Sequence, residues 1–262
     1  MIRFEQIELS KISELRNEYL NSLVVFQELY LELMLPESSC YLIYENNFVI
    51  AGYAIVASQN ILIEFYIFEQ FIPWGQSYFS QIIKELNICN IYCKSFYATL
   101  LNFCLLNTFN YTILGNHYRD YTDKGIDLNE WIKVRPAEML DIQFVMKQKD
   151  DIDELFETEE QLESFIRDES VFLFYLNDEF AGCGTILRVH PDWDYQDLGI
   201  WVKKEFRRQG VATHIINWSV SYCNSKKWIP ICGCDIENFA SQKTLEKCGF
   251  ISKYKLINFI VK

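Results

Sequence analysis

Apolar and polar positions alternate along the C-terminal half in runs that predict strands and helices in turn. Residues 171–176 and 180–189 are apolar runs separated by a polar turn at 177–179, a pattern typical of a β-hairpin. Residues 151–167 carry apolar positions at helical spacing among acidic ones, which predicts a helix. Further strands are expected at 131–135, 197–203, 228–234 and 254–261, and further helices at 210–225 and 239–247.

The N-terminal half repeats this order of elements. Residues 51–56 (AGYAIV) match 181–186 (AGCGTI), and Gly75 matches Gly210. Extra residues before two strands of the second half shift the alignment, and insertions of that kind belong in loops. The repeat predicts two domains, at 1–125 and 126–262, with a polar linker at 117–130, first-half strands near 41–45, 48–57 and 61–67, and a first-half helix near 75–86.

Composition supports folding and argues against a nucleic-acid reader. The chain has 262 residues, half of them hydrophobic, so it is long enough for one or two domains with their own cores. It holds 24 Lys and Arg against 36 Asp and Glu, a formal charge of −12. Such an acidic balance repels a polyanion and mildly favours cationic partners, although it also serves solubility.

Nine cysteines and three histidines do not form a metal pattern. The cysteines are odd in number and lie mostly inside apolar runs, so we expect free thiols that act as small hydrophobic side chains in a reducing compartment. Their spacing is too sparse for zinc. Residues 1–5 lead directly into mixed sequence, and no apolar run reaches the ~18 residues of a membrane span. These features predict a cytoplasmic protein without a metal.

A basic turn opens a predicted helix in the second half. Its sequence is VKKEFRRQGVAT (residues 202–213). Arg207 and Arg208 place positive charge on an otherwise acidic chain, while Gly210 and Ala212 allow close backbone approach to an anion. N–H groups at a helix start converge there, and the helix dipole adds positive potential. The run alone fits an anion site and a capped helix with a solvated turn equally well.

A second polar run lies at the start of the next helix. Asn238 and Ser241 are residue types that cap a helix start, and the helix ends in EKCGF at 246–250. An asparagine that follows a strand can also hydrogen-bond an extended amide ligand. Capping and ligand binding are therefore both open for Asn238.

Together the two runs resemble the GCN5-related N-acetyltransferase (GNAT) family. The first fits its pyrophosphate motif, Arg/Gln-x-x-Gly-x-Gly/Ala, and the second fits Asn-x-x-Ser/Ala followed by Glu-Lys-x-Gly-Phe, in the right order. Residues 134–137 (VRPA) also resemble the family's opening strand. The resemblance covers 131–262, and over 1–130 it rests on the repeat. It implies an α/β fold with two tandem GNAT-like domains, each a mostly antiparallel mixed sheet with flanking helices and one splayed parallel strand pair.

The resemblance implies acetyl-CoA as co-substrate, bound where the two parallel strands splay apart. Amides of the turn would hold the pyrophosphate, and one strand would pair with the pantetheine arm. An N–H group of that strand would polarise the thioester carbonyl. The residues expected to bind acetyl-CoA are Ile200, Trp201 and Val202 on the strand, Arg207, Arg208, Gln209, Gly210, Val211, Ala212 and Thr213 at the turn, and Asn238 and Ser241 at the second motif.

The catalytic groups are less defined, because Leu245 stands where the family often has a tyrosine acid. A leaving thiolate with a pKa of about 8.5 needs little help from an acid. Tyr254, Tyr195 and Cys234 are spare acid candidates. A carboxylate near a strand end could act as base, directly or through water, although such carboxylates also suit solvated loops and caps. The catalytic candidates are Asp197, Asp235, Glu237 and Tyr254.

The first half has lost the same motifs. Ile72 and Pro73 stand in place of the two arginines, and Tyr97 and Leu100 stand in place of Asn238 and its partner serine. An apolar turn cannot hold a pyrophosphate well, so we expect a degenerate repeat that supports the second domain. Its aromatic residues are expected to form core and interdomain contacts rather than a ligand site: Phe65, Tyr66, Phe68, Phe71 and Trp74.

The resemblance implies an N-acetyltransferase that moves acetyl from acetyl-CoA to a primary amine of a small molecule or peptide, by direct attack with both substrates bound. Asp192, Trp193 and Asp194 are expected in the acceptor pocket, where two carboxylates and an indole suit a cation, or else form an exposed turn. The alternative is an acyl-CoA-binding or regulatory protein without turnover. A transferase that takes its donor from tRNA is disfavoured by the charge.

Overall fold

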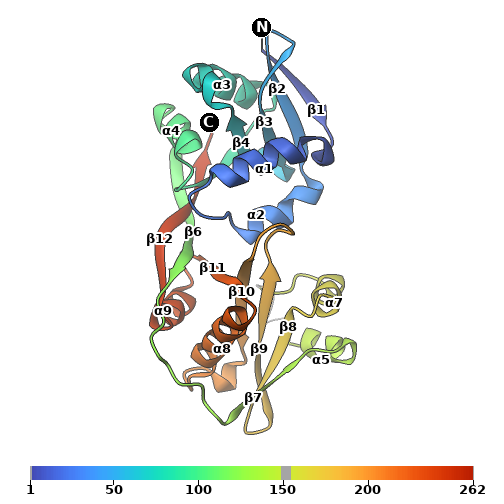
Figure 1. Ribbon diagram of the computed structural model, residues 1–262, viewed down its shortest axis with the longest axis vertical. Helices are drawn as coiled ribbons and strands as arrows, with labels where there is room; N and C mark the ends of the chain where they lie inside the picture. Colours follow the sequence, from blue (N-terminus) through green and yellow to red (C-terminus); the bar gives the residue numbers. More distant parts are fainter. Residues whose placement is uncertain (1, 149–154, 262) are drawn as a thin grey trace. The chain divides into compact units, whose positions relative to one another are not determined.

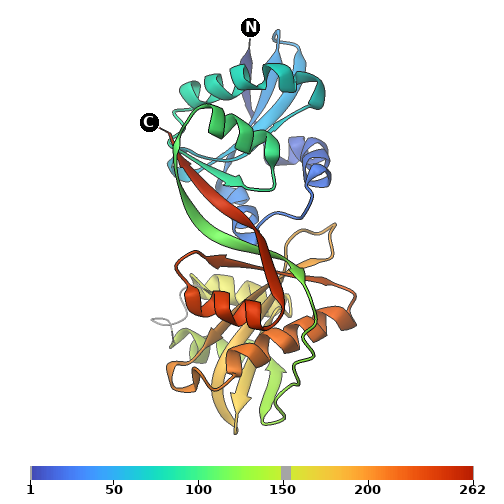
Figure 2. The same ribbon diagram turned by 90° about the vertical axis from the view of Figure 1, so that its left-hand side faces the viewer.

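The computed structural model describes residues 2–148 and 155–261. The chain divides into two compact units. Unit 1 comprises Met1–His117, Asp235–Glu237 and Tyr254–Lys262, and unit 2 comprises Tyr118–Cys234 and Asn238–Lys253. The chain crosses from one unit to the other within two long strands, after His117 and after Lys253, and also on either side of Asp235–Glu237 (Figures 1 and 2). Each unit therefore contains a segment from the other half of the sequence.

Unit 1 is a mostly antiparallel sheet with helices on its faces. Its strand order is β1-β2-β3-β4-β5-β12-β6, and β12 pairs antiparallel with β5. The strands are β1 (Arg3–Ile7), β2 (Ser39–Glu45), β3 (Val49–Ala57), β4 (Ile61–Ile67), β5 (Asn90–Lys94), and parts of β6 (Asn110–Tyr121) and β12 (Phe250–Ile260). The helices are α1 (Ser13–Ser22), α2 (Leu29–Met34), α3 (Gly75–Glu85) and α4 (Ala98–Leu106), with short 3-10 turns that include η3 (Ser58–Asn60) and η4 (Glu69–Trp74).

Unit 2 repeats this plan. Its strand order is β7-β8-β9-β10-β11-β6-β12, and only the β10–β11 pairing among the registers described for this unit is parallel. The strands are β7 (Ile132–Pro136), β8 (Val171–Leu176), β9 (Glu179–Arg188), β10 (Tyr195–Val202) and β11 (Ile229–Asp235). The helices are α5 (Ile142–Met146), α7 (Glu159–Arg167), α8 (Val211–Ser225) and α9 (Phe239–Lys247), with a 3-10 turn η6 (Lys204–Phe206).

In each unit one parallel strand pair is paired only at its start, within the residues described. In unit 2, β10 pairs with β11 from Tyr195 to Asp197, whereas it stays beside β9 as far as Val202. In unit 1, β4 pairs with β5 at Ile61 and Leu62. Beyond these points the strands separate. We call the two openings the unit 2 splay and the unit 1 splay.

The side chains of the splayed strands alternate between two helical layers. On β10, Leu198 and Val202 join the core beneath α8, while Trp201 joins the core beneath α5 and α7. On β4, the Phe65 ring packs against Phe79 of α3 at 5.4 Å between centroids, and the next residue back, Glu64, faces the opposite layer. The period-two pattern of a strand buried on both faces therefore fixes which groups reach each layer.

The predicted architecture is confirmed: two repeats of a mostly antiparallel mixed α/β sheet, each with flanking helices and one splayed parallel strand pair. Three predicted elements are wrong in extent. The strand expected at 254–261 is longer, because β12 already begins at Phe250. The helix expected at 151–167 begins at Glu159, because Thr158 caps it by accepting a hydrogen bond from the Gln161 amide at 3.1 Å. Its stretch 151–154 lies outside the described residues.

The linker expected at 117–130 is also wrong at its start, because β6 continues to Tyr121. The end of this strand was not predicted, because its polar residues interrupt the apolar pattern typical of a buried strand. In the fold their polar groups have partners: His117 Nε2 lies 2.8 Å from a carboxylate oxygen of Glu28, and Arg119 donates to the Cys232 carbonyl at 2.9 Å.

Candidate functional site

The basic turn of unit 2 is held by its own side chains. Arg207 Nε donates to the Val202 carbonyl at 2.9 Å, and Gln209 Nε2 donates to the Glu205 carbonyl at 2.7 Å. Arg208 takes a left-handed backbone conformation with φ +63°, and Gly210 follows with φ +84°. A β-carbon at Gly210 would meet nothing within 4 Å among the described atoms, so the backbone faces open space there.

Among the described residues, no side chain caps the start of α8. Gly210 is the N-cap and has no side chain to accept a hydrogen bond, and the first intrahelical bond runs from His214 N to the Gly210 carbonyl at 2.9 Å. The preceding N–H groups, of Val211, Ala212 and Thr213, are the donors that a helix start cannot satisfy internally. Helix α9 differs, because a side chain caps it. The α8 turn therefore has the chemistry of an anion site.

The backbone of β10 directs alternate peptide groups into the unit 2 splay. Lys203 N donates to the Ala181 carbonyl at 2.9 Å, which sets the phase of the β9–β10 ladder. Because antiparallel ladders alternate, Leu198, Ile200 and Val202 turn their N–H and C=O groups away from β9. The Val202 carbonyl accepts a hydrogen bond from Arg207. The N–H and C=O groups of Ile200 point into the splay, where an added extended amide chain could pair with them.

These features fit the chemical parts of acetyl-CoA. A pyrophosphate needs converging N–H donors and positive charge, which the α8 turn and its arginines offer. A pantetheine arm is an extended chain with two amides, which an unpaired strand edge can accept as a neighbour. Of the expected residues, Trp201, Val202 and Val211 are largely buried, whereas Arg208, Gln209 and Gly210 are exposed.

Asn238 caps helix α9 in the structure. Its Oδ1 accepts a hydrogen bond from the Ser241 amide at 3.1 Å, and its own carbonyl accepts from the Cys234 thiol at 3.6 Å. The second motif therefore has a structural function that the sequence left open. Its amide nitrogen is the part of the side chain that this cap does not use.

The four catalytic candidates do not fall in one unit. Asp197 lies in unit 2 on β10, at the last parallel pair with β11, opposite Ile231. Asp235 and Glu237 belong to unit 1, where the Asp235 carboxylate accepts from the Glu237 amide at 2.6 Å. Tyr254 also belongs to unit 1, with its ring 5.4 Å from that of Phe96. Asp197 is thus the candidate that shares a unit with the basic turn.

The expected acceptor residues form the loop between β9 and β10. Its shape is held by backbone and side-chain bonds: the His190 carbonyl accepts from the Trp193 amide at 3.2 Å, and Arg188 Nε donates to the Trp193 carbonyl at 3.3 Å. Asp192 and Asp194 are exposed, and Trp193 is half-buried. The Asp194 carbonyl accepts from Ile229 N at 2.9 Å, so the loop is fixed at the point where β10 meets β11.

Unit 2 contains a buried tyrosine that the sequence reading placed in the linker. Tyr118, at the end of β6, is 1% exposed and packs in the core beneath α8. Burial, followed by the charge of Glu246, raises its pKa to about 12. Leu245, at the family's usual tyrosine position, is buried in the same core. Only the topology, in which β6 joins unit 2, brings this phenol there, and no local pattern marks it.

The unit 1 splay is closed by the protein itself. Phe68 N donates to the Ala51 carbonyl at 2.9 Å, so Phe65 turns its carbonyl away from β3, as Ile200 does from β9 in unit 2. Tyr97 Oη donates to that Phe65 carbonyl at 3.1 Å. Tyr97 aligns with Asn238 in the internal repeat. Its phenol therefore occupies the Phe65 carbonyl, with which an added amide chain would have to form a hydrogen bond.

A buried polar network fills the α1 side of the same splay. The Glu64 carboxylate, 1% exposed, accepts from Arg16 Nη2 at 2.8 Å and from the Tyr53 hydroxyl at 2.9 Å. Burial alone would raise the pKa of Glu64, but the charge of Arg16 and its hydrogen bond lower it overall. Lys94 is fully buried and donates to Gln27 at 2.8 Å and to the Tyr19 hydroxyl.

The described residues contain no cluster of metal-ligating side chains and no disulfide. No group of three or more His, Cys, Asp and Glu side chains in 2–148 and 155–261 is placed to hold a metal ion. All nine cysteines are free thiols. In the same part of the chain, no helix is long and apolar enough to cross a membrane.

Two family profiles match the sequence, one in each half. The profile described as "Acetyltransferase (GNAT) domain" matches residues 8–121, and the profile described as "Acetyltransferase (GNAT) family" matches residues 136–250. The chain therefore belongs to the GNAT family as a tandem member. Membership supports acyl-CoA-dependent acetyl transfer in general, with acetyl-CoA as the implied co-substrate.

Solved structures share the fold across the whole chain. A GNAT-family acetyltransferase from Colwellia psychrerythraea aligns with a TM-score of 0.86 at 18% identity, over 99% of this chain and 100% of that one. A tandem GNAT protein from the clavulanic acid biosynthesis pathway aligns with a TM-score of 0.66 at 8% identity, over 100% and 98%. At such identities the likeness shows the fold alone. No curated protein matches the sequence.

Proposed function

We propose that the second half of the chain, residues 126–262, is an N-acetyltransferase that moves acetyl from acetyl-CoA to a primary amine. The observation that carries this proposal is the unit 2 splay: β10 parts from β11 after Asp197, beside an α8 start that has no side-chain cap. An extended thioester and its pyrophosphate suit that pairing of an open strand edge with an anion site. The first half, residues 1–125, is proposed to lack a working site.

Each part of the donor has a proposed partner. The amides from Gln209 to Thr213 hold the pyrophosphate, and Arg207 and Arg208 add charge. The peptide groups of Ile200 pair with the pantetheine arm, and the side-chain amide of Asn238 donates to the same arm. An N–H group of β10 polarises the thioester carbonyl where negative charge develops. The amine then attacks that carbonyl, and CoA leaves as a thiolate.

The proton of the attacking amine goes to a carboxylate in this proposal. Asp197 is favoured over Asp235 and Glu237, because it is half-buried and lies on β10, the strand proposed to pair with the pantetheine arm. A base in that position can act directly or through one water. The acid is not needed for a thiolate leaving group with a pKa of about 8.5.

The acceptor is proposed to approach past the β9–β10 loop. Asp192 and Asp194 put two exposed carboxylates on this loop, and Trp193 adds an indole face. Carboxylates and an aromatic face attract a protonated amine before it is deprotonated. This supports a small-molecule or peptide amine as acceptor, in line with the acceptors of GNAT enzymes generally.

The test is release of CoA thiol from acetyl-CoA in the presence of a panel of primary amines: small amines, polyamines and peptide N-termini. The double variant Arg207→Ala, Asn238→Ala should lose about 100-fold in kcat/KM, because it removes one charged and one neutral hydrogen bond to the donor. The matched control Arg167→Ala, Asn224→Ala removes the same side-chain types from exposed positions of unit 2 and should keep full activity.

Two results would overturn the proposal. The first is an unchanged rate in the double variant, which would place the donor elsewhere. The second is acetyl-CoA binding without thiol release for every amine in the panel, which would make the chain a binding protein.

A further inference from the structure

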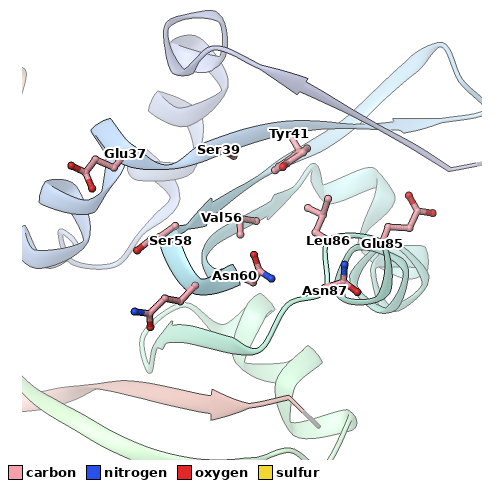
Figure 3. A pocket seen from close by; sticks show the side chains of 11 residues that line it. Glu37, Ser39, Tyr41, Val56, Ser58, Asn60, Glu85, Leu86 and Asn87 are labelled. Atoms are coloured by element: carbon pink, nitrogen blue, oxygen red, sulfur yellow. The ribbon is translucent and has the colours of Figure 1, made fainter.

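Two cavities lie in unit 1, and their lining residues are not among those proposed to bind the donor. One, of about 450 Å³, lies where η3 meets the turn after α3. Figure 3 shows Ser58, Asn60 and Asn87 around it, with Glu37 and Glu85 at its two ends pointing away from each other. This mixture of hydroxyls and amides has no dominant chemistry and indicates no ligand class.

The second cavity, of about 640 Å³, has a distinct character. It lies between the β1–β2 end of the sheet and the start of α3, the region labelled α3, β1 and β2 in Figure 1. Its size falls in the range of small-molecule sites. Its lining is Ile2, Glu45, Asn46, Phe71, Trp74, Ser77, Tyr78 and Gln81.

Three aromatic rings form part of the wall. Phe71 and Trp74 come from η4, and Tyr78 comes from α3. The rings of Phe71 and Tyr78 meet edge to face, with 6.5 Å between centroids and 85° between planes. Tyr78 is buried, whereas Trp74 is 59% exposed. The sequence reading expected Trp74 to serve core or interdomain contact, but an exposed indole that lines a cavity is available to a ligand.

One carboxylate faces these rings and is fixed in place. The Tyr78 hydroxyl donates to Glu45 Oε2 at 2.5 Å, which orients the carboxylate and leaves its other oxygen free of that bond. No Lys, Arg or His is among the lining residues that the structure describes. On a chain of net charge −12, such a wall attracts positive charge.

The repeat explains why this site differs from its counterpart. In unit 2 the matching turn carries Arg207 and Arg208, which favour an anion. In unit 1 the same positions are Ile72 and Pro73, and Trp74 stands where Gln209 does. The substitution removes both positive charges and adds an aromatic face.

From this geometry we propose that the cavity formed by Glu45, Phe71, Trp74 and Tyr78 binds an organic cation, a quaternary or primary ammonium with a small apolar body. The aromatic faces attract the cation through their quadrupoles, and Glu45 supplies the counter-charge. This ligand site is separate from acetyl transfer and does not depend on it.

Choline and its neutral isostere 3,3-dimethylbutan-1-ol test the proposal, because they share a shape and differ in charge. Each is titrated by calorimetry into the full chain without acetyl-CoA, so the outcome is independent of the proposed transferase activity. Choline should bind in the millimolar range or tighter, at least about fivefold better than the alcohol. Trp74→Ala should weaken choline about five- to thirtyfold, and Glu45→Gln should remove the preference for charge.

The matched control is Trp131→Ala, which removes an indole that is 73% exposed on unit 2 and should leave choline binding unchanged. The proposal is overturned if the two probes bind equally, or if Trp74→Ala and Trp131→Ala have the same affinity. It is also overturned if choline at about 50 mM shows no binding to the wild type. One aromatic contact and one charge contact should together give a tighter affinity than that result would allow.

Discussion

The two splayed strand pairs share a backbone and differ in what occupies them. In unit 2, β10 leaves β11 after Asp197, and Ile200 directs its peptide groups into the opening. In unit 1, β4 leaves β5 after Leu62, but Tyr97 bonds the Phe65 carbonyl across the opening. The repeated fold supplies the opening twice, and the side chains decide whether it stays available to a ligand.

The unit 1 splay is occupied by ion-paired side chains as well as by the Tyr97 ring. Arg16, Glu32 and Glu64 form an ion-paired cluster, with Arg16 Nη2 2.6 Å from Glu32 and 2.8 Å from Glu64. Such a cluster is stable only while every member keeps its partner. The α1 side of the opening is therefore occupied by a part of the core that depends on internal charge pairing.

Removing one charge from this cluster is the change with the largest expected effect. Glu64→Gln should lower the free energy of unfolding by about 3 to 5 kcal/mol, because it leaves Arg16 and Lys94 buried without their main counter-charge. Urea denaturation measures this. The matched control Asp178→Asn breaks an exposed ion pair with Lys133, 2.7 Å long, and should cost less than about 1 kcal/mol. Equal losses in the two variants would mean that the cluster contributes no more than a surface pair.

The pH dependence of stability sharpens the same comparison. Burial lowers the pKa of Lys94 to about 8, against the opposing effect of Glu64. The unfolded chain keeps this proton up to a pH near 10.5, so above pH 8 it binds more protons than the folded state, and Lys94 makes stability rise with pH. The difference in unfolding free energy between the wild type and Lys94→Met should therefore grow by about 1 to 2 kcal/mol from pH 8 to about 9.5.

Subtracting the unfolding free energy of Lys94→Met from that of the wild type cancels the contributions of groups that titrate in the same way in both proteins. Burial also raises the pKa of thiols such as Cys40, to about 11, and these act equally in both proteins. If the difference in unfolding free energy between the wild type and Lys94→Met stays constant over this pH range, the folded protein does not hold Lys94 in its neutral form above pH 8.

Much of the fold could be predicted because local patterns and the repeat agree. The hairpin of β8 and β9, the strand β4 and the helix α9 lie within two residues of their predicted bounds. Their signals are local: apolar runs, a polar turn, and Gly249, which has φ +102° after α9. The glycine of the pyrophosphate motif also has the positive φ that favours this residue type.

Long-range placement could not be predicted. Nothing local indicates that β6 carries Tyr118 into unit 2, or that β12 pairs with β5 of unit 1. For the same reason, Asp235, Glu237 and Tyr254 could be proposed by type but not assigned to a unit. The Glu64 network was missed because its members lie far apart in sequence, and a lone charge inside an apolar strand gives no hint of its partners.

Calorimetric titration of acetyl-CoA into the full chain tests the central claim most directly. The account predicts one site per chain, weakened about 100-fold by Gly210→Asp, because a carboxylate then faces the pyrophosphate. Gly125→Asp is the matched control, since Gly125 also has positive φ, at +59°, and open space around its β-carbon position. It should leave binding unchanged. Two sites per chain, no binding, or equal weakening by both variants would contradict a single donor site in unit 2.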